Sequence, residues 1–199
     1  YGPDCEVYVK SLHFTESDSE GVLVWNDNER TLDLILNSVT LQIGQEQLFY
    51  GKATENINNG DVVEFAGAQG DHLLFKKADL QNANFKPQYI IGVATENLSN
   101  NQFGYVTVQG KVRDLDTSNF TEGALLYVSP DDVGTLIDSE TSTPDDNITI
   151  AAVTRSHDNQ GSIFVRPTFS DSIGKLHNVS TENTEDRYVL IYDSDVGYW

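Results

Sequence analysis

Apolar and polar residues alternate along short stretches of this chain. The clearest stretches carry Leu32, Leu34 and Leu36 in one case and Val106 and Val108 in the other. Side chains two positions apart lie on the same face of a β-strand, so this period predicts strands with one face in a hydrophobic core. Further strands, rich in β-branched and aromatic residues, are predicted at 62–65, 89–93, 124–128, 148–153 and 163–165.

The segments between these strands are rich in residues that favour turns. Gly, Asn, Asp and Pro gather in them, and such residues tolerate left-handed or turn geometry. Helical periodicity is nearly absent. Residues 78–85 could form one short helix, but Asn82, Asn84 and Pro87 favour a loop or a single turn. Many short strands joined by turns predict an all-β protein, either a β-barrel or a β-sandwich. The predicted turns are 58–60, 67–70, 129–132 and 158–161.

The middle of the chain contains a weak internal repeat. Residues 58–112 and 121–166 each place a Gly before a strand, a second Gly after it, a strand of small residues and a final alternating strand. We therefore predict two similar β-units that share one core within a barrel domain at 48–169. A strand-rich lead-in at 1–47 precedes this domain, and a polar linker with a final strand at 170–199 follows it.

The charge of the chain restricts its partners. Its 199 residues include 31 acidic and only 12 basic side chains, a formal net charge of −19. Such a surface repels phosphate backbones and anionic lipid headgroups, which predicts neither a nucleic-acid nor a membrane partner. Any self-association must then come from buried apolar area or bound cations.

The sequence lacks the residues for a disulfide and the signals for membrane insertion and export. Cys5 is the one cysteine, so an intramolecular disulfide is excluded. No apolar run approaches the roughly 18 residues that a membrane span needs, and the first residues do not resemble a secretory signal. We expect a soluble chain that is not exported.

Catalytic motifs are poor. Ser156, His157 and Asp158 are the three residue types of a hydrolase triad, but neighbours in a strand or turn rarely converge in the hydrogen-bond relay that a triad needs. The remaining histidines are scattered singly, and no glycine-rich phosphate-binding motif occurs. We predict no catalytic residue, no cofactor site and no enzyme.

Metal binding is the least implausible chemistry. Asp193 and Asp195 resemble the first ligands of an EF-hand loop, but the sequence ends before the bidentate Glu. Adjacent carboxylates are expected in the turns of so acidic a chain, so no metal site is predicted. Other oxygen donors are Asp114 with Asp116, Asp131 with Asp132, and residues 145–147.

Two surface signals have simple explanations. The sequons at Asn97, Asn119, Asn147 and Asn178 are expected by chance in a chain rich in Asn, Ser and Thr. Trp25, Trp199 or the tyrosines could stack on a carbohydrate. In β-proteins, however, aromatic residues more often belong to a core or an interface.

A series of short segments, in this order along the chain, carries a resemblance to known proteins. It begins with Gly21 to Asn26 and runs to Gly161 to Val165, and a closing part leads to Trp199. The segments are 21–26, 30–34, 39–46, 59–63, 91–96, 103–106, 110–113, 122–123, 126–129, 134–136, 152–157 and 161–165, with 176–180 and 189–193 in the closing part.

These segments resemble tail-fibre and other virion proteins of tailed bacteriophages. The resemblance covers residues 21–166. It implies a structural virion component, assembled in the host cytoplasm, that forms a homotrimer and contacts other virion proteins. The repeated β-units also resemble those of capsid-decorating proteins, so a head-decoration protein is an alternative. A receptor- or glycan-binding adhesin, with a host surface glycan as partner, is another.

The strands supply candidates for packing, either in the core or between subunits. Trp199, after the polar linker, is the candidate for packing of the chain end on a neighbour. The other candidates are Trp25, Leu32, Leu34, Leu36, Tyr105, Val106, Val108, Leu126, Tyr127, Ile163 and Val165.

Overall fold

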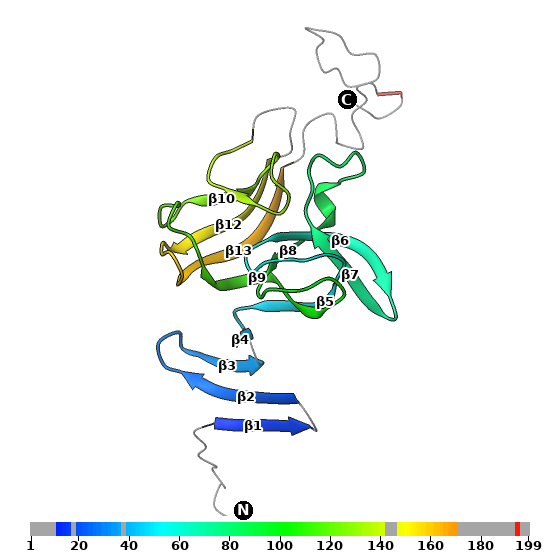
Figure 1. Ribbon diagram of the computed structural model, residues 1–199. Coiled ribbons are helices and arrows are strands. Elements are labelled where there is room, and N and C mark those ends of the chain that lie inside the picture. The colour runs from blue at the N-terminus through cyan, green and yellow to red at the C-terminus, as the bar shows by residue number, and fades with distance from the viewer. Residues whose placement is uncertain (1–10, 17–18, 37–38, 142–146, 171–193, 196–199) are drawn as a thin grey trace, which may run out of the picture.

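The computed structural model describes residues 11–16, 19–36, 39–141, 147–170 and 194–195. These residues form two β-sheets (Figure 1). The first, called here the small sheet, is an antiparallel meander in the order β1-β2-β3-β4. Its strands are β1 (Ser11–Glu16), β2 (Ser19–Asn26), β3 (Thr31–Leu36) and β4 (Val39–Ile43).

The second, called here the large sheet, contains nine strands in the order β11-β10-β12-β13-β9-β5-β7-β6-β8. β8 also pairs with β9, and this pairing closes β5, β7, β6, β8 and β9 into a barrel. The strands are β5 (Gln47–Ala53), β6 (Val62–Gln69), β7 (His72–Lys77), β8 (Ile90–Ala94), β9 (Phe103–Leu115), β10 (Leu125–Val128), β11 (Leu136–Ile137), β12 (Asn147–Arg155) and β13 (Gly161–Ser170).

The all-β prediction is confirmed. The described residues contain no α-helix, and a 3-10 turn, η1 (Pro87–Tyr89), precedes β8. The segment 78–85 consists of turns and irregular backbone, because the side chains of Asp79 and Asn82 accept from backbone N–H groups two residues further on instead of continuing a helix. None of the described segments forms a helix that could span a membrane.

The two predicted β-units are present and have the same strand order. β6 pairs with β8 and β8 with β9, just as β10 pairs with β12 and β12 with β13. The turn before each unit is also the same: the N–H of Gly60 donates to the carbonyl of Ala94 at 3.0 Å, and that of Gly123 to Val153 at 2.8 Å. Both glycines have positive φ, 95° and 84°, which other residues adopt only with strain.

The units share one hydrophobic core. Val62 and Val93 from the first unit pack with Leu126, Ile163 and Val165 from the second. A second cluster fills the barrel itself and had no separate signal in the sequence. Its members are Ala53, Ile57, Val63, Phe75, Ile91, Ala94, Leu98 and Val106.

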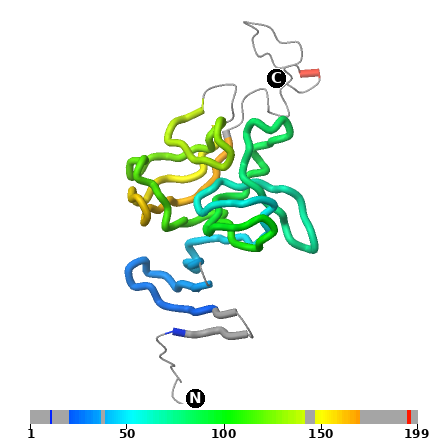
Figure 2. The backbone as a smooth tube through the Cα atoms, in the orientation of Figure 1, coloured from blue at the N-terminus to red at the C-terminus, as the bar shows by residue number. Residues whose placement is uncertain are grey.

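The long strand β9 connects these parts. Its first half pairs with β5 and β8 in the barrel wall, and its second half pairs with β13 of the second unit. The tube in Figure 2 shows the small sheet at one end of the described chain, next to the barrel. Whether the small and large sheets are separate domains stays a prediction.

The packing candidates divide by position. Val106, Leu126, Ile163 and Val165 are fully buried, and Tyr127 is nearly so. Tyr105 and Val108 are half-buried, as are Leu34 and Leu36 in the small sheet. Trp25 and Leu32 are exposed. Trp199 lies outside the described residues.

Candidate functional site

One face of the small sheet carries apolar residues across β2, β3 and β4. Cross-strand pairing places Trp25, Leu32 and Ile43 in one row across β2, β3 and β4. Directly paired residues share a face of an antiparallel sheet, as do residues two apart on one strand. The next rows are therefore on the same face, which we call the apolar face: Leu23, Leu34 and Leu41, then Gly21, Leu36 and Val39.

The described part of the chain leaves much of the apolar face in contact with solvent. Trp25 is 53% exposed, Leu32 37% and Ile43 45%, while Leu34 and Leu36 are half-buried. The prediction that the Leu32, Leu34 and Leu36 stripe faces a core is thus wrong for the single chain. The physical reason is the fold: β2, β3 and β4 pack chiefly against one another, while the large sheet packs around its own cores.

The opposite face of the small sheet is mixed in character. Asn26 Nδ2 donates to Asp33 Oδ2 at 2.8 Å, and Thr31 Oγ1 donates to the carbonyl of Ile43 at 3.1 Å.

On the apolar face, Trp25 Nε1 donates to Asp27 Oδ1 at 2.9 Å, so the polar group of this side chain already has a partner within the chain. What Trp25 offers to a partner is its apolar ring surface.

Glu46 joins the small sheet to the barrel. Its side chain is only 2% exposed, and Oε1 lies 2.7 Å from Nη2 of Arg113, whose side chain is 31% exposed. Oε1 also accepts from the backbone N–H of Lys111 at 3.2 Å, and Oε2 from that of Gln42 at 2.8 Å. One buried carboxylate therefore binds the end of β4 and the second half of β9. We call this set of contacts the Glu46 junction.

Gly110 makes room for the Glu46 junction. Its φ is 127°, and a Cβ built there would lie 2.6 Å from Glu46 Cγ and 2.9 Å from Glu46 Cα. Such distances are shorter than real Cβ contacts, so any larger residue must displace Glu46 or the strand.

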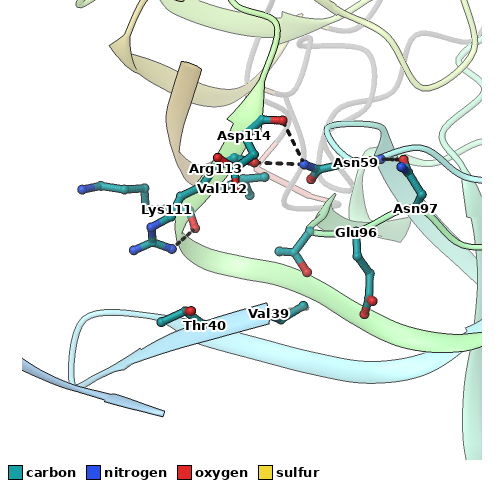
Figure 3. Close-up of a pocket in the computed structure, with 10 residues that line it drawn as sticks. Val39, Thr40, Asn59, Glu96, Asn97, Lys111, Val112, Arg113 and Asp114 are labelled. Carbon is teal, nitrogen blue, oxygen red and sulfur yellow. Dashed lines mark hydrogen bonds between the residues drawn. The ribbon is translucent and has the colours of Figure 1, made fainter. Parts of the chain in front are cut away.

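A groove of about 270 Å³ lies beside the junction, between β4 and β9 (Figure 3). Lys111 Nζ is 2.9 Å from Glu29 Oε1, and Asn59 Nδ2 donates to the carbonyl of Arg113 at 2.9 Å. The backbone N–H of Asn59 donates in turn to Asn97 Oδ1 at 2.8 Å. These polar groups already bond to each other, so the groove is built as a junction between parts of the fold.

Ser156, His157 and Asp158 do not form a triad relay. Ser156 Oγ donates to the carbonyl of Thr117 at 3.1 Å instead of bonding to the imidazole. His157 Nδ1 lies 2.7 Å from Asp158 Oδ1, and backbone N–H groups of the following turn also point at this nitrogen. These contacts stabilise the turn between β12 and β13. The absence of catalysis stays a prediction.

No group of three or more His, Cys, Asp or Glu side chains with metal-binding geometry occurs among the residues that the structure describes. Asp116 Oδ1 accepts from the backbone and hydroxyl of Ser118, and these bonds lower the pKa of its carboxyl. Asp193 lies outside the described residues, whereas Asp195 is exposed in a turn.

Comparison with known proteins gives little. No protein-family model and no curated protein matches the chain. The structure is similar to that of the N base of the head fiber protein gp8.5 of bacteriophage phi29, with 12% sequence identity and a TM-score of 0.38. The alignment covers 64% of this chain and 99% of that chain. At these values the likeness bears on neither the assembly nor the ligands of this chain.

Proposed function

We propose that this protein is a structural component of a tailed-phage virion that assembles as a homotrimer through the apolar face of its small sheet. The apolar face is the observation that carries the proposal. The sequence resemblance to fibre and other virion proteins supports the class of protein and the number of subunits.

A second copy is the partner that fits the apolar face best. A net charge of −19 gives the chain an acidic surface, and uncharged Trp25, Leu32 and Ile43 offer no charge complementarity to a basic partner. An apolar surface in an acidic protein is buried most simply against the same surface of other copies. In a homotrimer, three such faces meet around a threefold axis.

Covering the apolar face supplies part of the free energy that association requires. Complete burial of a large apolar side chain stabilises by roughly 3 kcal/mol. The exposed fractions of Trp25, Leu32 and Ile43 are 53, 37 and 45%, so covering this one row contributes about 4 kcal/mol per subunit. The half-buried second row of Leu23, Leu34 and Leu41 adds to this. A structural role needs this kind of stabilisation, because association makes each marginal domain more durable.

Two substitutions in the same strand test the proposal. Leu32 and Ile35 both lie in β3 with similar exposure, 37 and 38%, but three positions apart and hence on opposite faces. Leu32→Glu places a charge on the apolar face, and Ile35→Glu places it on the other. Light scattering should give three times the chain mass of 22.1 kDa for the wild-type protein and Ile35→Glu, and a monomer for Leu32→Glu.

The salt dependence of trimer formation provides an independent test. Because acidic copies repel one another, raising NaCl from roughly 0.05 to 0.5 M should screen the repulsion and strengthen the trimer. An assembly held by ion pairs would weaken instead. A wild-type protein that stays monomeric at micromolar concentration, or a trimer that Leu32→Glu leaves intact, would overturn the proposal.

A further inference from the structure

Four aromatic side chains and a lysine form a cluster on the outer surface of the barrel. Tyr50 and Lys52 come from β5, Phe103 and Tyr105 from β9, and His72 from the start of β7. Tyr50 pairs with Tyr105 and Lys52 with Phe103 across the two strands, so these four share a face. The alternate positions, which include Ala53 and Val106, point into the barrel core and are fully buried. We call these five side chains the ring cluster.

The rings contact one another directly. The Tyr50 and Phe103 rings are nearly parallel, with an interplanar angle of 20° and centroids 5.7 Å apart. Tyr105 lies 4.9 Å from Tyr50, and His72 meets Phe103 edge to face at 4.9 Å. Lys52 Nζ stands 6.0 Å from the Phe103 centroid and donates to Gln69 Oε1 at 3.1 Å. These contacts hold the rings in a fixed arrangement before any partner binds.

The cluster remains open to solvent. Tyr50 is 48% and Phe103 38% exposed, and His72 is exposed as well. Partial burial, together with nearby Tyr50 and Glu96, raises the pKa of Tyr105, so its hydroxyl keeps its proton and can donate a hydrogen bond. The surface thus presents partly exposed aromatic rings together with two phenol hydroxyls, an imidazole and an ammonium group.

We propose that the ring cluster is a binding site for a neutral pyranose saccharide. A pyranose has C–H groups on its faces and hydroxyls around its edge. The C–H groups stack on the negative faces of aromatic rings, and the hydroxyls bond to polar groups at the border. Tyr50 and Phe103 form the stacking surface, while the Tyr105 hydroxyl, His72 and Lys52 provide the polar border.

Two features of the molecule favour this ligand over others. The ring cluster differs from the apolar face, where aliphatic side chains without polar atoms predominate, so it is less suited to a dry contact with a second copy. The net charge of −19 disfavours polyanionic chains such as nucleic acids or acidic polysaccharides, and Lys52, the one cation of the cluster, is already bonded to Gln69. The inference does not depend on trimer formation.

The full chain should be applied to an array of neutral oligosaccharides of glucose, galactose, mannose and N-acetylglucosamine, and the strongest binder titrated by calorimetry. Tyr50→Ala and Phe103→Ala should each weaken binding by roughly three- to tenfold, because each removes one stacking ring. Phe103→Leu should weaken it to a similar extent, since leucine keeps apolar area but lacks the ring.

Phe164→Ala is the matched control. Phe164 is as exposed as Phe103, at 38%, but lies on β13 away from the cluster, so its loss should leave the affinity unchanged. Circular dichroism of each variant verifies that it is folded. The proposal is overturned if no saccharide binds the wild-type protein, if Phe103→Leu binds as well as wild type, or if Tyr50→Ala changes the oligomeric mass instead of saccharide affinity.

Discussion

The Glu46 junction allows a sharp test of what holds the small sheet on the barrel. Glu46→Gln keeps the size and shape of the side chain but removes its charge. The amide has one oxygen in place of two, so at least one of the three N–H donors around it then faces another donor. We expect this substitution to lower the free energy of unfolding.

The magnitude follows from burial. Removing one partner of a fully buried ion pair costs about 3–5 kcal/mol. Glu46 is 2% exposed but Arg113 is 31% exposed, so water takes over part of the lost interaction, and we expect about 2–3 kcal/mol. Urea unfolding followed by circular dichroism measures this loss directly.

A second ion pair on β9 is the control. Lys111 and Glu29 lie 2.9 Å apart, but Glu29 is 43% exposed and Lys111 25%. Exposed pairs contribute little, so Glu29→Gln should cost about 0.5 kcal/mol. If Glu46→Gln costs no more than Glu29→Gln, the buried carboxylate does not stabilise the junction, and the reasoning is refuted.

The remaining predictions concern packing and pH. Gly110→Ala should lower the free energy of unfolding by about 2 kcal/mol or more, because its Cβ meets Glu46, and its urea midpoint would show this. Leu126→Ala should cost about 2–5 kcal/mol by the same assay, since Leu126 is fully buried in the shared core. Burial raises the pKa of Glu64 above 4.5 despite its contact with Lys76 at 3.0 Å. A carboxyl whose pKa is raised in the folded state costs stability as pH rises above its ordinary value of 4.5 and it ionises. Glu64→Gln stays neutral, so its free energy of unfolding should increase relative to that of wild type as pH rises above 4.5.

The sequence predicted six of the nine strands of the large sheet, because these strands follow simple rules, whereas β5, β7 and β11 were not predicted. Period-two alternation placed Val106 and Val165 correctly in the core. The glycines before equivalent strands indicated the repeat, because Gly60 and Gly123 occupy the same left-handed turn position. These signals are local, because each depends on only a few neighbouring residues.

Other features depend on contacts between distant residues. The Leu32, Leu34 and Leu36 stripe predicted a strand, but periodicity cannot say whether the opposing surface belongs to the same chain. The ring cluster brings together Tyr50 and Phe103, which are adjacent only through the register of β5 and β9. Glu46 and Arg113 likewise meet only after folding, and neither residue stood out in the sequence.

The Glu46 junction links the two proposed surfaces of the molecule. The apolar face belongs to the small sheet, the ring cluster belongs to the barrel, and β5, which carries Tyr50, begins directly after Glu46. A trimer formed by the small sheets therefore presents three ring clusters in an orientation that this junction sets. If the junction is rigid, three sites bind a multivalent saccharide surface more tightly than one site binds a soluble oligosaccharide. Glu46→Gln should then weaken binding to an immobilised saccharide more than binding to the same saccharide in solution, because it disturbs the relation between the sites and leaves each site intact.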